Sequence, residues 1–123
     1  MKIFVTHSSD IDVKTDLYDP IRNSDFNAQH EIKLPQEFGK ETITKEMIQS
    51  QDLIIAESSM PSTGSGIELG WADMYGVPIV NIYKKGSKSS SSMRYVTDVH
   101  IEYIDTEDMI TKLRDYINNH IIM

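Results

Sequence analysis

Short apolar runs alternate with amphipathic stretches along the chain, and this alternation predicts the order of strands and helices. Residues 2–6 form a β-rich run followed at once by loop-forming residues, which is typical of a strand. Residues 53–56 are continuously apolar, as in strands that are buried on both faces of a parallel sheet. Three further strands are predicted, within residues 28–34, over 78–83 and near 100–104.

Apolar residues at helical spacing separate these runs. Val13, Leu17 and Ile21 stand four residues apart, although Pro20 limits the length of a helix there. The predicted helices lie within residues 12–23, over 41–50, over 66–76 and after the acidic residues 105–108.

The alternation of strands and helices implies right-handed βαβ units and a parallel sheet that is covered on both faces. We therefore expect a single domain over residues 1–123. Its fold should be an α/β, three-layer flavodoxin or Rossmann-like fold with a five-stranded parallel sheet. Open sheets of this class bind ligands at the carboxyl ends of their strands. The two predicted loops at such ends with the most polar chemistry are residues 7–10 and 58–65.

The charge of the chain narrows the class of ligand. There are 12 Lys and Arg residues against 19 Asp and Glu residues, a formal net charge of −7, and the basic residues are scattered. A nucleic acid would be repelled overall, so we expect none as a partner. A small nucleoside or nucleotide is compatible with this charge, because backbone N–H groups can hold a phosphate without net positive charge.

Two absences bear on chemistry and location. Cysteine is absent, which excludes disulfides, thiolate metal sites and cysteine nucleophiles, and the histidines show no metal-ligand spacing. We therefore expect neither a metal nor another cofactor. The apolar run at residues 3–5 is too short for a signal peptide, and no stretch approaches the roughly 20 apolar residues of a membrane span. We expect a cytoplasmic protein without membrane contact.

The segment from Asp52 to Ala72 carries the candidate chemistry. It reads Asp-Leu-Ile-Ile-Ala-Glu-Ser-Ser-Met-Pro-Ser-Thr-Gly-Ser-Gly-Ile-Glu-Leu-Gly-Trp-Ala. It passes from a buried strand through a hydroxyl-rich loop into a helix, where Gly64 and Gly66 would let a ligand approach the backbone. Helix N-termini favour anions. Glu68, in the predicted first turn, would therefore be ionised at neutral pH, as a glycosidic nucleophile must be.

Two other interpretations of this segment compete. Ser65-x-x-Glu68 fits a capping box, in which each side chain satisfies a backbone N–H of the other residue. The glycines also resemble a dinucleotide-binding fingerprint. Against that fingerprint, the third glycine comes one residue late, and Lys84 and Lys85 stand where an acidic residue would bind a ribose.

The same segment resembles the signature of the nucleoside 2-deoxyribosyltransferase family, especially its branch of 2′-deoxynucleoside 5′-phosphate N-hydrolases. That signature is an Asp, an apolar strand, and then Ala-Glu-x-x-x-Pro-Ser-x-Gly-x-Gly-x-Glu-Leu-Gly-x-Ala, and every fixed position is present here with its spacing. The resemblance is specific over residues 52–83 and loose elsewhere. It implies cleavage or transfer at the N-glycosidic bond of a (deoxy)nucleoside or nucleoside 5′-monophosphate through a glutamyl-enzyme intermediate.

The resemblance also implies roles for individual residues. Glu68 would be the nucleophile, and Ser62 would bind the 5′ side of the substrate. Ser91 corresponds to a serine that, in the hydrolases, reaches the phosphate site of a neighbouring subunit, which implies a homodimer or larger assembly. His7, at a strand end, is the one histidine placed to touch a ligand. The expected substrate-binding residues are Ser8, Ser62, Gly64, Gly66, Ser91 and His7.

Three positions depart from the family. The hydrolases carry a Gly-Ser-x-Arg turn after the first strand, and here Asp10 takes the place of the Arg and would repel a phosphate. The strand tyrosine of the family falls on Phe4, and an acidic residue that works beside the nucleophile falls on Thr44. These changes indicate either a different substrate or activity that is reduced or lost. For the acid that protonates the leaving base, Glu57 and His7 are the candidates.

Two alternative functions follow from the same residues. Residues 3–10 are similar to the first box of TIR domains, some of which split NAD with a glutamate on the helix after a middle strand. A TIR-like NAD glycohydrolase would cleave the same class of bond. A non-catalytic sensor of nucleotide derivatives, or an assembly module that uses the same pocket, is the third interpretation, and the changes at Asp10 and Thr44 favour it.

Overall fold

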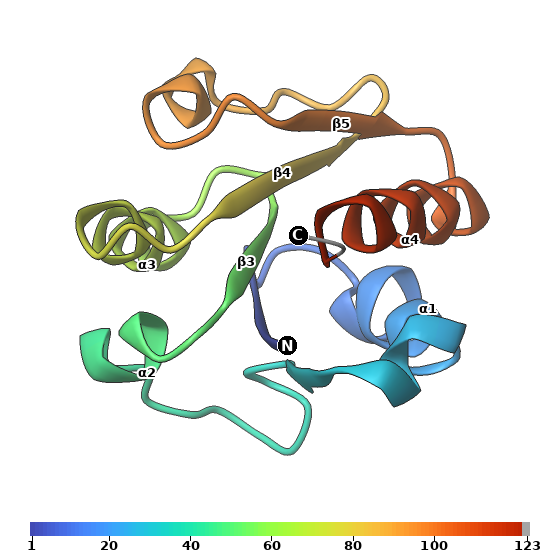
Figure 1. Cartoon of the computed structure of the whole chain (residues 1–123). Coiled ribbons are helices and arrows are strands. Elements are labelled where there is room, and N and C mark those ends of the chain that lie inside the picture. Colours follow the sequence, from blue (N-terminus) through green and yellow to red (C-terminus); the bar gives the residue numbers. More distant parts are fainter. Residues whose placement is uncertain (122–123) are drawn as a thin grey trace.

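Five parallel strands form one sheet in the computed structural model, which describes residues 1–121 (Figure 1). The sheet order is β2-β1-β3-β4-β5, and every neighbouring pair is parallel. This is a flavodoxin-like arrangement, so the fold class predicted from the sequence is confirmed. The strands are β1 (Lys2–His7), β2 (Glu31–Lys33), β3 (Leu53–Glu57), β4 (Ile79–Lys84) and β5 (His100–Tyr103).

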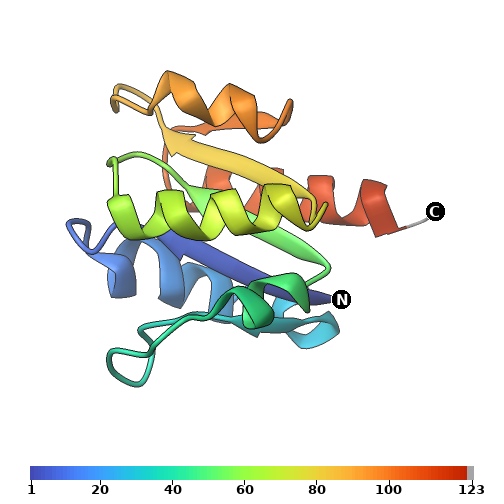
Figure 2. The same cartoon turned by 90° about the vertical axis from the view of Figure 1, so that its left-hand side faces the viewer.

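Helices cover both faces of the sheet (Figure 1). α1 and α4 pack together over one face, and α2 and α3 pack together over the other, where Figure 2 shows α3 in front of the strands. The helical elements are η1 (Lys14–Tyr18), α1 (Asp19–Arg22), η2 (Asp25–Gln29), α2 (Lys45–Gln49), α3 (Thr63–Met74), η3 (Ser91–Tyr95) and α4 (Thr106–Ile121). None of the helices within residues 1–121 has both the length and the apolar character needed to cross a bilayer.

The helix predicted within residues 12–23 is one helical stretch made of two short pieces that follow each other without a gap, η1 and α1. The first, η1, is a π-turn in which the Asp19 N–H donates to the carbonyl of Lys14, five residues earlier. Pro20 has no N–H to continue this pattern, and it stands instead in the first turn of α1, where no N–H is needed. Ile21 is nevertheless fully buried, as its spacing predicts.

The helix predicted over residues 41–50 is shorter than expected. α2 begins after Thr44, whose Oγ1 accepts a hydrogen bond from the Met47 N–H at 3.3 Å. Thr44 has the extended backbone of an N-cap residue, so the helix begins after it and does not extend back to residue 41. Ile48 is the buried residue of this short helix.

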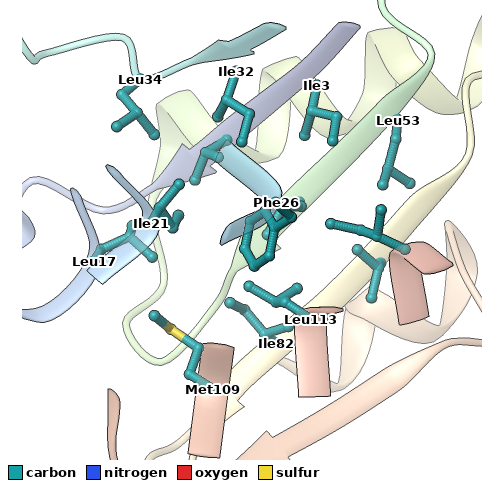
Figure 3. Close-up of a cluster of buried hydrophobic side chains, with 14 of the residues drawn as sticks. Ile3, Leu17, Ile21, Phe26, Ile32, Leu34, Leu53, Ile82, Met109 and Leu113 are labelled. Carbon is teal, nitrogen blue, oxygen red and sulfur yellow. The ribbon is translucent and has the colours of Figure 1, made fainter. Parts of the chain in front are cut away.

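Two apolar clusters fill the space between the sheet and its helices. The larger lies on the α1/α4 face and includes Ile3, Phe26 and Leu113 (Figure 3). The smaller lies on the α2/α3 face and includes Phe4 and Ile54. Side chains alternate along a strand, so the odd-numbered residues of β1 and β3 contact the first cluster and the even-numbered residues contact the second. This alternation decides which polar side chains at the strand ends can meet.

Candidate active site

The start of α3 differs from the predicted start. Ser62 is the N-cap residue: its Oγ accepts from the Ser65 N–H at 3.3 Å, and its carbonyl accepts from the Gly66 N–H at 3.0 Å. The helix therefore begins three residues earlier than the sequence pattern indicates. The capping box Ser65-x-x-Glu68 is not formed, because Ser65 already lies inside the helix and Ser62 is the cap.

Glu68 lies in the second turn of α3, not in the predicted first turn. Its Oε1 accepts a hydrogen bond from Thr6 Oγ1 at 2.7 Å, and Thr6 Oγ1 also lies 2.8 Å from Ser65 Oγ. Among residues 1–121 no donor bonds to the second oxygen, Oε2, and this oxygen is not enclosed. One carboxylate oxygen is thus fixed by the sheet, and the other has no hydrogen-bond partner among the described residues.

Burial is the main influence on the acidity of Glu68, and it raises the pKa of the carboxyl above its usual value. The Thr6 hydroxyl acts in the opposite direction and lowers this pKa, because its hydrogen bond stabilises the charged form. The expectation that Glu68 lies in the first turn, where the helix N-terminus would hold it ionised, is therefore corrected in its position and in its cause. Glu68 is half-buried and one turn further along, and the Thr6 hydroxyl is the group that opposes the effect of burial.

A cleft of about 480 Å³ lies between the start of α3 and η3. Ser65 lines it, and because Ser65 also contacts Thr6, it connects the cleft to the hydrogen bond at Glu68. The lining that the structure describes does not include Glu68, so its carboxylate does not open directly into the cleft as expected. The hydroxyl-bearing residues of the lining are Ser58, Ser62, Thr63, Ser65, Ser90 and Ser92.

Packing within the described chain does not explain the two glycines at the start of α3. A Cβ at Gly64 or Gly66 would meet no protein atom within 4 Å, and neither residue has a positive φ. The described chain therefore does not require glycine at either position. Gly66 lines the cleft, so its missing side chain leaves room for a ligand to approach the backbone.

His7 ends β1 and is only 7% exposed. Its Nε2 lies 2.6 Å from the Tyr18 hydroxyl, and its Nδ1 lies 2.9 Å from the carbonyl oxygen of Ser8. These partners assign a neutral ring in which Nδ1–H donates to Ser8 and Nε2 accepts from Tyr18, in keeping with a pKa that burial lowers. Both ring nitrogens are occupied, so His7 supports the loop and offers a ligand no ring nitrogen.

Glu57 faces away from Glu68. It lies at an odd-numbered position of β3, on the α1/α4 face, and is 2% exposed. Its carboxylate accepts hydrogen bonds from the Ser59 N–H at 2.7 Å, from the Ser59 hydroxyl at 2.8 Å and from the Tyr103 hydroxyl. His7, its register partner in β1, points to the same face. Neither candidate acid is therefore placed beside the Glu68 carboxylate.

The remaining expected residues lie in loops at the same edge of the sheet. Ser8 is buried, and its Oγ accepts a hydrogen bond from the N–H of the exposed Asp10 at 3.0 Å. Ser91 is exposed at the start of η3, outside the cleft, whereas its neighbours Ser90 and Ser92 line the cleft. Within one chain, Ser90 and Ser92 thus face the cleft, whereas Ser91 faces the outer surface.

Sequence reasoning does not identify Thr6 as the partner of Glu68. A signal is nevertheless present, because Thr6 is polar at an even-numbered strand position, two residues after the core residue Phe4. A polar group placed toward a helix in this way needs a hydrogen-bond partner on that helix. The pattern does not say which helical residue provides it.

Comparisons with known proteins agree with the family resemblance. No family model matches the chain. A curated protein from Syntrophotalea carbinolica, named as a 2′-deoxynucleoside 5′-phosphate N-hydrolase, is 40% identical to it over 45 residues. The match covers 37% of this chain and 32% of that protein, or about a third of each.

A solved structure agrees with the fold. The CMP N-glycosidase of Clostridium botulinum superposes with a TM-score of 0.68 and covers 93% of this chain and 99% of its own chain, at 24% sequence identity. This match confirms the α/β fold. The curated match confirms that the chain is similar to the 2′-deoxynucleoside 5′-phosphate N-hydrolase branch of the nucleoside 2-deoxyribosyltransferase family, as predicted from residues 52–83.

Proposed function

We propose that this chain cleaves the N-glycosidic bond of a nucleoside or nucleoside 5′-monophosphate, with Glu68 as the nucleophile. The observation that carries the proposal is the arrangement of the carboxylate: Thr6 holds Oε1, and Oε2 has no hydrogen-bond partner among residues 1–121. The curated relative is named for hydrolysis of this kind of bond, which supports the same chemistry here. The same match favours this function over a TIR-like one.

The proposed reaction proceeds in two displacements at C1′ of the sugar. Glu68 Oε2 attacks C1′ as the C1′–N bond breaks, and the base leaves with the bonding electron pair. The transition state resembles an oxocarbenium ion, and the product is a sugar ester of Glu68. Water then attacks C1′ and releases the carboxylate, so the sugar retains its configuration; a second base in place of water gives transfer.

The cleft beside Ser65 is the proposed position of the 5′ side of the substrate, with C1′ outside its lining, at Glu68. Its volume of about 480 Å³ lies in the range of small-molecule sites. The Ser62 side chain lines it at the N-terminus of α3, where the helix dipole favours a negatively charged 5′ group. Because Glu57 and His7 face the other side of the sheet, the proton that the leaving base takes up comes from neither of them.

A turnover assay tests this function. The panel contains deoxynucleosides, ribonucleosides, their 5′-monophosphates and NAD, and free base is the product measured. We expect base release from at least one nucleoside or monophosphate, and adding a second base distinguishes transfer from hydrolysis. Cleavage of NAD alone would instead identify a TIR-like enzyme. Binding of a nucleotide without any turnover would identify a sensor.

Asp10→Arg is expected to tighten the binding of a 5′-monophosphate and to leave the free nucleoside nearly unchanged. Asp10 is exposed in the loop after β1, and at the position of the family's Arg its charge would repel a phosphate. Two unit charges about 4 Å apart cost about 1 kcal/mol in bulk water, which corresponds to a gain of about fivefold when that repulsion is removed. Calorimetry with both ligands measures the difference. Asp115→Arg, the same charge change at an exposed site on α4, is the control, and an equal effect of the two variants would contradict the prediction.

A homodimer or larger homo-oligomer is part of the proposal, with Ser91 of one chain serving the site of its partner. Ser91 is exposed and lies outside the cleft of its own chain. The outer side of α3 also presents exposed apolar side chains, Ile67 and Met74. Light scattering at the assay concentration measures the assembly, and a strictly monomeric, active protein would contradict it.

A further inference from the structure

We propose that Thr6 is a positioning residue for Glu68, and that the Ser65 hydroxyl completes a hydrogen-bonded relay from the cleft to the carboxylate. This inference rests on the proposed role of Glu68 as the nucleophile. Neither Thr6 nor Ser65 stands at a fixed position of the sequence signature, so the assignment comes from the geometry of this chain.

Thr6 is fully buried in the sheet. It is 0% exposed, and its register partner in β3 is the apolar Ala56. A hydroxyl buried among apolar groups must find a hydrogen-bond partner within the protein. Both hydrogen-bond partners of Thr6 Oγ1 within residues 1–121 belong to α3: Glu68 Oε1 at 2.7 Å and Ser65 Oγ at 2.8 Å. The hydroxyl therefore ties the central part of the sheet to the helix that carries the nucleophile.

The single hydroxyl proton of Thr6 sets the direction of the two hydrogen bonds. Thr6 has one hydroxyl proton, so it can donate to only one of its two partners. An ionised carboxylate has no proton and is the stronger acceptor, so Thr6 donates to Glu68. Ser65 must then donate to Thr6, which leaves the Ser65 oxygen as an acceptor at the cleft wall. If Glu68 is protonated, the direction of both hydrogen bonds can reverse, so that Glu68 donates to Thr6 and Thr6 donates to Ser65.

The relay acts on the orientation and on the charge state of the Glu68 carboxylate. A hydrogen bond to Oε1 fixes the carboxylate plane and leaves Oε2 as the attacking atom. It also favours the ionised form of Glu68 against the effect of burial, which raises the pKa of this carboxyl. Thr6 touches no substrate atom in this scheme. Its contribution is the orientation and the charge state of Glu68.

The test compares Thr6→Val, which keeps the shape and removes the hydroxyl, with Thr6→Ser, which keeps the hydroxyl. For Thr6→Val we expect kcat to fall about 10- to 100-fold, the range for losing a hydrogen bond to a charged group, with little change in KM. The acid limb of the kcat–pH profile should move to higher pH, because Glu68 loses the group that lowers its pKa. Thr6→Ser should restore most of kcat and the original acid limb.

A direct titration of Glu68 gives a readout that does not depend on activity. Carbon-13 NMR of labelled glutamate carboxyls, with Glu68→Gln to assign the signal, should show the Glu68 pKa higher in Thr6→Val than in the unaltered chain. Ser65→Ala should move it in the same direction by less. If Thr6→Val does not fold, the Ser65→Ala titration decides the relay: an unchanged Glu68 pKa overturns it.

The outcomes separate the two proposals. An inactive Glu68→Gln beside a Thr6→Val variant with unaltered kcat and pH profile would overturn the role of Thr6 and leave the proposed function standing. An active Glu68→Gln would overturn the proposed function, and the titration would then show only whether Thr6 bonds to the carboxylate. Loss of kcat in both Thr6→Val and Thr6→Ser, with an unchanged acid limb, would mean that Thr6 serves packing only.

Discussion

Glu68→Gln is expected to abolish base release, with kcat lower by several orders of magnitude on whichever nucleoside or nucleotide is the substrate. The amide keeps the size of the side chain and can still accept the hydrogen bond from Thr6, but it lacks the charge that attacks C1′. The fold should barely change, because the burial of Glu68 disfavours the charge that the substitution removes. Thermal unfolding and activity, measured on the same sample, distinguish loss of chemistry from loss of structure.

The control for this experiment is Asp73→Asn, the same kind of charge removal at an exposed position of α3. It should leave activity unchanged. A 2′-fluorinated substrate, which slows the second step, should leave a sugar adduct that intact mass and peptide mapping place on Glu68. An adduct on another residue, or an active Glu68→Gln, would remove the assignment.

Phe26→Ala is expected to have the largest effect on stability, lowering the free energy of unfolding by about 3–5 kcal/mol. Phe26 is 1% exposed and lies in the middle of the cluster under α1 and α4 (Figure 3). Removing its ring takes away apolar burial and leaves a cavity that the surrounding side chains fill only in part. For a chain of this length the melting temperature should fall by about 10 °C or more.

Phe38→Ala is the matched control, because Phe38 is 97% exposed and the chemical change is identical. Its effect should stay within about 0.5 kcal/mol. Urea denaturation of both variants measures the difference. Equal destabilisation by the two substitutions would show that the change acts through the unfolded chain and not through the core.

The sequence predicts the sheet well because strands buried on both faces leave continuous apolar runs, such as residues 53–56. Helix boundaries are predicted less well, because several residues near an end can serve as caps. Ser62 and Ser65 are both suitable N-cap residues, and only the backbone path shows that Ser62 is used. In the same way, Pro20 signals a break in the first helix but does not say that a π-turn precedes it.

The candidate site is predicted in part. The motif identifies Glu68, the glycine-containing turn and the edge of the sheet, because these depend on residues that are close in sequence. The partner of Glu68 is 62 positions earlier, and such a contact depends on the sheet order and on the packing of α3, which no local pattern contains. The orientation of Glu57 and His7 can be predicted from the sequence, because strand alternation places both on the face of the sheet opposite to that of Thr6.

The alternation along β1 also limits where the chain can change in length. β1 lies between β2 and β3 and is paired with both, so its register is set from two sides. Inserting or deleting one residue before Thr6 would place Val5 or His7 against α3, with the wrong chemistry facing Glu68. Insertions in the exposed segment around Gly39 would carry no such penalty. In natural variants and engineered versions of this protein, changes in length should therefore be absent from β1 and collect in that loop.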